Sequence, residues 1–86
     1  MKKGVCIKIK QIRLEKNFSQ DYMAIRLGLS QSQYAKVENG VQELTLIRLI
    51  QISEILDINP TQLFEELVYD YYIKGDLQLE IIDTKK

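Results

Sequence analysis

Residues 19–40 read SQDYMAIRLGLSQSQYAKVENG, and this stretch decides the fold. It holds two short runs with the apolar spacing of a helix, each preceded by a serine. Ser19 and Ser30 suit the N-cap position, because a serine hydroxyl accepts a hydrogen bond from an unpaired N–H of the first helical turn. Gly28 stands between the runs, where a turn needs a left-handed or crowded backbone position. We therefore predict two short helices joined by a tight turn, the second ending at Asn39-Gly40.

The second of these helices carries polar side chains that a core helix would not need. On a helical wheel, Tyr34 and Val37 share the inward face, with Ser30 at its edge. The opposite face and its flanks carry two amides, a hydroxyl and an ammonium, from Gln31, Ser32, Gln33 and Lys36. Such groups can bind base edges and phosphates in the major groove of DNA. The alternative is an ordinary solvated polar helix, and the wheel alone does not exclude it.

The context favours the DNA-binding interpretation. A short helix, a turn at glycine and a second helix with exposed amides is the plan of a helix-turn-helix. Small Ala24 on the first helix allows the second to approach closely. Glu38 falls near the buried side of its helix, where an unpaired carboxylate would be costly. We expect Arg13, on a preceding helix, to be its partner in a structural ion pair.

Apolar spacing and cap residues predict three more helices around this pair. The first precedes it and ends near Asn17, the next spans residues 46–56, and the last begins at Pro60. The helix over 46–56 is apolar almost all round, whereas a surface helix shows only one apolar stripe. Its outer side should therefore be covered by residues 68–86 or by a second subunit. The expected fold is all-α, with a five-helix domain over residues 1–67.

Residues 68–86 form a C-terminal extension of different character. The segments VYDYYI and LQLEII are rich in β-forming residues and flank KGD, which suits a turn. The pattern fits a β-hairpin, or an extension of the last helix followed by one strand. A two-stranded hairpin alone is marginal in water, so the extension should dock on something. Its three tyrosines suit a dimerisation element or a site for a protein partner, and equally suit packing against the 46–56 helix.

Composition argues against several classes of function. The 86 residues suffice for one small domain, with no histidine and a single cysteine, Cys6. The chain thus lacks the commonest general base, and one thiol makes neither an internal disulfide nor a zinc site. We expect no enzyme activity, no metal and no cofactor. No run approaches the roughly 18 apolar residues of a membrane span, and the start lacks the apolar core of a signal peptide, which predicts a cytoplasmic protein.

The formal net charge is +0, but charge is unevenly distributed along the chain. Residues 1–40 hold eight basic and three acidic side chains, whereas residues 41–86 hold four basic and nine acidic ones. A basic half that contains the predicted helix-turn-helix suits contact with phosphate. A chance distribution of solvated charge is the alternative.

One ungapped pattern runs through most of the chain. It comprises Ile12-Arg13, Phe18-Ser19-Gln20, Met23-Ala24, Gly28-Leu29-Ser30-Gln31, Tyr34 and Val37-Glu38-Asn39-Gly40, then Leu49, Ile52, Leu56-Asp57-Ile58-Asn59-Pro60 and Leu63-Phe64. With this pattern, residues 7–66 resemble the xenobiotic-response-element (XRE) family, the Cro/C1-type helix-turn-helix proteins similar to the lambda and 434 phage repressors. The resemblance implies a five-helix, lambda-repressor-like domain that is usually a dimer, binds operator DNA and regulates transcription.

Carried over by position, the resemblance implies two sets of contacts with double-stranded DNA. The bases would be faced by Gln31, Ser32, Gln33 and Lys36. Backbone phosphates would be met by Ser19, Gln20, Asn39 and Gly40, with Gln20 also bracing the first recognition residue.

The chain departs from the family twice. Family members often have Lys or Arg just after the glycine, where this chain has Val41, Gln42 and Glu43, and a glycine often stands at the position of Asp57.

We therefore predict a sequence-specific transcriptional regulator, a repressor that binds a palindromic operator as a homodimer. Its two recognition helices should lie about 34 Å apart, one turn of DNA. Repression is favoured because occlusion of polymerase is the least demanding mechanism. The alternative is an antitoxin-like or accessory interaction module that keeps the fold and binds a protein through residues 68–86.

Overall fold

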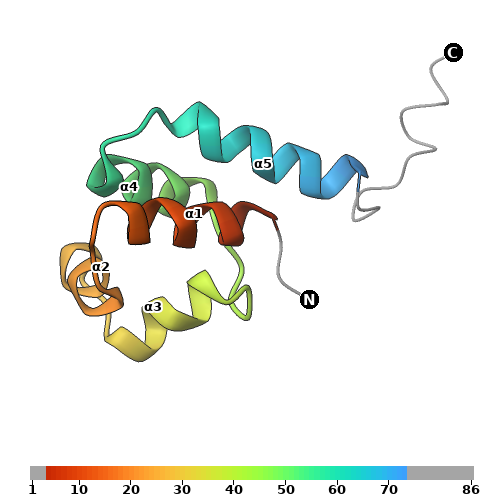
Figure 1. Cartoon of the computed structure of the whole chain (residues 1–86). Helices are drawn as coiled ribbons and strands as arrows, with labels where there is room; N and C mark the ends of the chain where they lie inside the picture. Colours follow the sequence, from red (N-terminus) through yellow and green to blue (C-terminus); the bar gives the residue numbers. More distant parts are fainter. Residues whose placement is uncertain (1–3, 74–86) are drawn as a thin grey trace, which may run out of the picture.

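The computed structural model describes residues 4–73, which form five α-helices (Figure 1). They are α1 (Gly4–Glu15), α2 (Gln20–Leu27), α3 (Gln31–Glu38), α4 (Leu46–Leu56) and α5 (Pro60–Ile73). In Figure 1, α1 lies in the middle, with α3 below it and α5 above it. The all-α class and the five-helix, lambda-repressor-like architecture are confirmed.

The helices begin and end where the sequence supplies cap residues. The side-chain oxygens of Ser19, Ser30 and Thr45 each accept a hydrogen bond from the backbone N–H three residues further on. Gly28 ends α2 in the left-handed conformation, with a φ of 73°. Asp57 ends α4 in the left-handed conformation, with a φ of 58°, which aspartate tolerates better than most residues other than glycine. Helix boundaries are thus set locally, before any packing is considered.

Every helix contributes to one core. Its buried apolar side chains are Val5, Cys6, Ile9, Ile12, Met23, Ala24, Tyr34, Val37, Leu49, Ile52, Leu56 and Leu63. Ile7 is 45% exposed, because it lies on the other side of α1 from the buried Ile9. The cap at Ser30 and the core contacts of Tyr34 together fix the direction in which α3 presents its outer side.

The last helix runs past position 68, where we expected the C-terminal extension to begin, and continues to Ile73. Residues 68–73 are therefore helical, as in the second of the two alternatives, although the segment is rich in β-forming residues. The strand expected further on, within residues 74–86, lies outside the described residues. Packing against α1 explains the helix, since tertiary contacts override a local preference for β structure.

A buried carboxylate joins the two ends of the described chain. Asp70 of α5 is 1% exposed, and its two oxygens accept hydrogen bonds from the backbone N–H groups of Gly4, at 2.8 Å, and Val5, at 3.0 Å. These are orphan donors of the first turn of α1, so α5 caps α1 from across the molecule. A Cβ on Gly4 would lie 2.8 Å from Asp70 Oδ1, which explains why glycine occupies this position.

Replacing this carboxylate should measurably weaken the fold. Asp70→Ala leaves the buried N–H of Val5 and the part-buried N–H of Gly4 without an acceptor, so we expect the free energy of unfolding to fall by about 1 to 3 kcal/mol. Glu65→Ala, at an exposed position of the same helix, should change it by less than about 0.5 kcal/mol. Urea denaturation followed by circular dichroism measures both values. Equal losses in the two variants would contradict the role of Asp70 as a cap for α1.

Candidate nucleic-acid interface

The outer side of α3 is the candidate interface. It forms the lower edge of the molecule in Figure 1, facing away from α1. All four residues expected to contact bases are exposed, and they are Gln31, Ser32, Gln33 and Lys36. On the inner side, Tyr34 is fully buried and Val37 is 4% exposed. A helix with side chains is about 10–12 Å across, and the major groove of DNA is about 12 Å wide, so α3 can enter it.

Beneath this surface lies a buried ion pair. Arg13 of α1 donates two hydrogen bonds to Glu38 of α3, from Nε to Oε2 at 2.7 Å and from Nη2 to Oε1 at 3.0 Å. Tyr34 donates its hydroxyl to the same Oε2 at 2.7 Å, and Arg13 Nη1 donates to the backbone oxygen of Phe18. Glu38 is completely buried and Arg13 is 6% exposed. The pair therefore ties α1, α3 and the α1–α2 turn together.

The surroundings of Glu38 hold it in the ionised form. Burial by itself raises the pKa of this carboxyl group, but hydrogen bonds donated by Arg13, Gln20 and Tyr34 outweigh burial and leave the pKa below its ordinary value. The hydrogen bond to Glu38 in turn raises the pKa of Arg13, and burial together with that carboxylate raises the pKa of Tyr34. The site keeps one buried negative charge because enough donors surround it.

A chain of hydrogen bonds connects this ion pair with the exposed surface. Gln20, at the start of α2, donates from Nε2 to Glu38 Oε1 at 2.9 Å. Its own side-chain oxygen accepts a hydrogen bond from Gln31 Nε2 at 3.0 Å. Gln31 is thereby held on the α2 flank of the recognition helix, with its amide oxygen and second N–H available to a ligand. The structure brings Gln20 and Gln31 together, as the resemblance implies.

Two of the predicted contact residues also serve as caps. Gln33 accepts a hydrogen bond from the backbone N–H of Ser30 through Oε1, which completes a capping box at the start of α3. Its NH₂ group remains the part of the side chain that can bind a base edge. Ser19 uses an oxygen lone pair to cap α2, so its O–H hydrogen can still be donated to a phosphate. These side chains are fixed before any DNA binds.

The residues after α3 turn the chain back sharply. Asn39 is the C-cap, and Gly40 has a φ of 77°, which favours glycine. The backbone N–H groups of Val41 and Gln42 both donate to the carbonyl oxygen of Lys36, at 2.9 and 3.1 Å. Asn39 and Gly40 are exposed at the end of the recognition helix, where we expected them to meet a phosphate.

Arg48 is a cation near this surface that the sequence argument missed. It lies in the first turn of α4 and lines a hollow of about 110 Å³ with Gln33, Val37, Gln42 and Glu43, beside Leu29 and Thr45. Its Nη1 donates to Gln51 at 3.0 Å, one turn along the same helix. The loop after α3 lacks the usual Lys or Arg, so Arg48 places a positive charge on the flank of α3 opposite Gln20. A helical wheel of α4 could have identified it, but only with the position of α3 known.

Comparison with known proteins identifies the family. Residues 9–63 match the helix-turn-helix family model. The control protein C.MunI of Mycoplasma sp is 34% identical over 61 residues, which cover 70% of this chain and 82% of that protein. The uncharacterized HTH-type transcriptional regulator YqaE of Bacillus subtilis (strain 168) is 34% identical over 68 residues, 79% of this chain and 51% of that protein, so this chain spans about half of its length.

The chain therefore belongs to the XRE-type (Cro/C1-type) helix-turn-helix family of DNA-binding transcriptional regulators. Among residues 4–73, no three carboxylate or thiol side chains gather as they would around a metal ion. Each helix within this range is too short or too polar to cross a lipid bilayer.

Removing the partner of Glu38 should be severely destabilising. Arg13→Met leaves a buried carboxylate without its cation, and we expect the free energy of unfolding to fall by about 3 to 5 kcal/mol. The double variant Arg13→Met with Glu38→Gln should recover part of this loss, because no unpaired charge remains. The control is Lys16→Met, which removes an exposed positive charge three residues after Arg13. Urea denaturation measures all three, and a loss below about 1 kcal/mol for Arg13→Met would refute the argument.

The same ion pair makes stability depend on pH. The pKa of Glu38 in the folded chain lies below its ordinary value of 4.5, so the unfolded chain binds the proton more readily. The stabilisation is thus fully present above 4.5 and is lost as the pH falls through the folded-state pKa. We expect the free energy of unfolding of Glu38→Gln to depend less on pH between 5 and 2 than that of the wild type. Parallel curves for the two proteins would show that Glu38 is not the titrating group.

Proposed function

We propose that this chain is a repressor that binds a palindromic operator as a homodimer, with α3 of each subunit in the major groove. The observation that carries the proposal is the unbroken series of hydrogen bonds from the buried Arg13–Glu38 pair through Gln20 to Gln31. Such a series fixes an amide at the surface before DNA arrives, which reduces the entropy lost on binding. A merely solvated polar helix has no need of that support.

The side chains of α3 divide into base readers and phosphate contacts by their place on the helix. Ser32 and Lys36 lie opposite the core and face the floor of the groove, while Gln31 and Gln33 lie on its two flanks. Ser19 and Gln20 stand beside Gln31 at the N-terminus of α2, where orphan N–H groups favour a phosphate. Asn39 and Gly40 meet the backbone beyond α3. Phosphate contacts fix the register, and the four α3 side chains supply specificity.

The names of both relatives, a control protein and a transcriptional regulator, agree with a regulatory role. Repression is the form we propose, because a bound dimer needs only to block polymerase. A second candidate is an antitoxin-like or accessory module that acts through protein contacts. It is favoured by the aromatic side chains that α5 leaves exposed, Phe64 at 47%, Tyr69 at 52% and Tyr72 at 38%. The two functions differ in whether the protein by itself binds DNA of a particular sequence.

Selection of genomic DNA fragments with the purified protein separates these candidates. We expect an enriched palindrome whose half-site centres are one helical turn apart. Gln31→Ala should relax one position of each half-site, at a cost of about 1 to 3 kcal/mol for the preferred base. Gln62→Ala, an exposed glutamine of α5, should leave the motif unchanged. If no motif is enriched, or if Gln31→Ala leaves it intact, the regulator proposal fails and the interaction module is favoured.

Arg48 should contribute one phosphate contact per subunit. We expect Arg48→Gln to reduce the slope of log K against log salt concentration by about one per subunit, without altering the selected motif. Its loss of affinity should be roughly tenfold larger at 50 mM than at 200 mM salt for a dimer. Arg48→Lys should keep the slope, because the charge remains.

The matched control for Arg48 is Arg26→Gln. Arg26 lies at the end of α2, where it donates to Tyr22 and lines the neighbouring hollow with Gln51 and Glu54. This variant removes the same charge from the C-terminal end of α2, whereas the phosphate contacts that we expect from α2 lie at its N-terminal end, at Ser19 and Gln20. Fluorescence anisotropy across a salt series measures both slopes. Equal changes for Arg48→Gln and Arg26→Gln would show an effect of total charge, and would rule out a specific contact at Arg48.

A further inference from the structure

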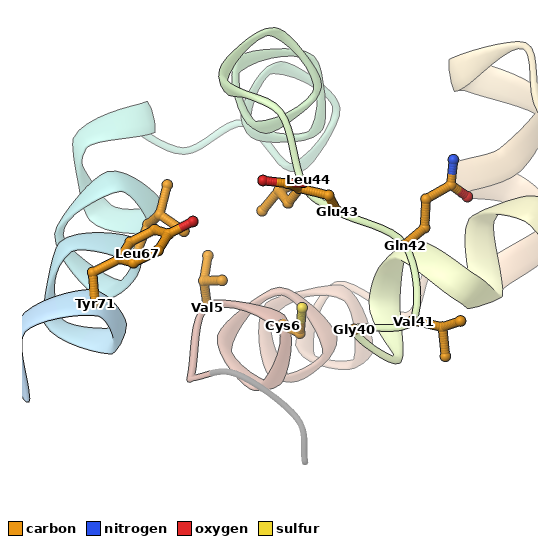
Figure 2. A pocket seen from close by; sticks show the side chains of 9 residues that line it. All are labelled: Val5, Cys6, Gly40, Val41, Gln42, Glu43, Leu44, Leu67 and Tyr71. Atoms are coloured by element: carbon orange, nitrogen blue, oxygen red, sulfur yellow. The ribbon is translucent and has the colours of Figure 1, made fainter. Parts of the chain in front are cut away.

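A pocket of about 270 Å³ lies between the start of α1, the loop after α3 and the second half of α5 (Figure 2). Its lining residues are Val5, Cys6, Gly40, Val41, Gln42, Glu43, Leu44, Leu67 and Tyr71. Pockets that hold drug-sized ligands have volumes of about 300–1,000 Å³, so this one suits a smaller organic molecule. Of its lining residues, only Gly40 belongs to the DNA contacts proposed above.

The pocket combines an apolar wall with one carboxylate. Val5 is fully buried, and Leu44 and Leu67 are partly buried side chains that pack against the core. Tyr71 adds an aromatic ring. Figure 2 shows the Glu43 side chain extending from the loop toward Tyr71, above Val5. An organic ammonium suits such a site, because its apolar body contacts the wall while its charge pairs with the carboxylate and lies against the ring.

The charges around the pocket favour a cation over an anion. Among the nine lining residues, Glu43 is the one charged side chain, and none is a lysine or an arginine. The N-terminus of α1 also borders the pocket, and the partial positive charge of a helix N-terminus attracts anions. Here Asp70 already compensates that charge, since it accepts the N–H groups of Gly4 and Val5 at 2.8 and 3.0 Å. An anion would therefore find no donor that is not already used by α5.

The loop after α3 belongs both to the pocket and to the candidate DNA interface. Gly40 lines the pocket and is also the residue expected to meet a phosphate beyond α3. The N–H groups of Val41 and Gln42 both donate to the carbonyl oxygen of Lys36, which holds the loop against the recognition helix. Three residues span at most about 11 Å, so the backbone of Glu43 lies within that distance of Gly40. This is close to the Debye length of about 10 Å at 0.1 M salt, so the carboxylate repels a phosphate bound there.

We propose that this pocket binds a small organic ammonium with an apolar body, and that the bound cation strengthens DNA binding. The ligand supplies the positive charge that family members often place just after the glycine, where this chain has Val41, Gln42 and Glu43. Pairing with the cation removes the repulsion between Glu43 and the DNA backbone. Only the effect on DNA rests on the proposed function, because the ligand binds to the free protein.

NMR titration of the isotope-labelled full chain tests the site. The probes are phenethylamine and two molecules of nearly the same shape, the neutral phenethyl alcohol and the anion hydrocinnamate. We expect phenethylamine to shift the backbone amide signals of residues 40–44 saturably, with a dissociation constant of about 1 mM or lower. The alcohol should bind about tenfold more weakly, since it lacks the charge-assisted hydrogen bond, and hydrocinnamate should leave these signals unshifted.

Two variants separate Glu43 from the total charge of the chain. Glu43→Gln should bind the amine and the alcohol equally within about twofold, and it should fold normally because position 43 is exposed. The control is Glu65→Gln, at an exposed position of α5 that lies two residues before Leu67 and thus on the other side of the helix. This variant should keep the wild-type preference for the amine.

Three results of the titration would overturn the proposed site. The first is that phenethylamine causes no saturable shift, or shifts only signals away from the pocket. The second is that the wild type binds the alcohol or hydrocinnamate as tightly as the amine. The third is that Glu43→Gln keeps the preference, or that Glu65→Gln loses it to the same extent.

Fluorescence anisotropy with a labelled duplex of mixed sequence tests the effect on DNA binding. Non-specific binding depends on phosphate contacts, so the operator need not be known. At constant ionic strength, we expect saturating phenethylamine to tighten binding about two- to fivefold at about 50 mM salt and less at about 200 mM. Glu43→Gln should bind more tightly by a similar factor without the amine, and should not respond to it.

The two experiments fail independently. Amine binding that leaves DNA affinity unchanged would overturn the regulatory part of the proposal, and a Glu43→Gln variant that still responds to the amine would do the same. A protein that binds the amine but no DNA would reject the proposed function while the ligand site stands. A protein that binds DNA but no amine would reject the ligand site alone.

Discussion

The structure depends on one completely buried carboxylate. Glu38 faces the core of a domain too small to leave such a charge uncompensated, so the fold must supply its donors. Arg13 supplies two, Tyr34 one and Gln20 one, and these residues come from three helices. Together these hydrogen bonds hold α1, α2 and α3 in their relative placement. The geometry of the helix-turn-helix is therefore fixed by electrostatics as well as by apolar packing.

Under the proposed function, this arrangement lets a structural ion pair support recognition without touching DNA. The ion pair is buried, but Gln20 links Glu38 to Gln31, because it hydrogen-bonds to both side chains. An amide supported in this way keeps one orientation, and an amide can discriminate bases only when its donor and acceptor ends are not interchanged. If Gln31 reads a base as we propose, stability and specificity share the same residues, and a substitution at Glu38 would affect both.

The second buried carboxylate, Asp70, performs a different task. It joins the final described helix to the first turn of α1, and so places α5 against the core along most of its length. With α5 held there, the outer sides of α4 and α5 are left facing solvent next to each other.

The sequence by itself determined the helices and their ends, since caps at Ser19, Ser30 and Thr45 and left-handed residues at Gly28 and Asp57 act over a few neighbouring positions. It also indicated the outward side of α3, because helical periodicity is a local property. Only the tertiary structure decided that residues 68–73 are helical, since burial of Asp70 against α1 outweighs their β preference. The same holds for the position of Arg48 beside α3 and for the pocket between α1, α5 and the loop after α3. Each of these depends on how distant helices pack, and periodicity within one helix carries no information about its neighbours.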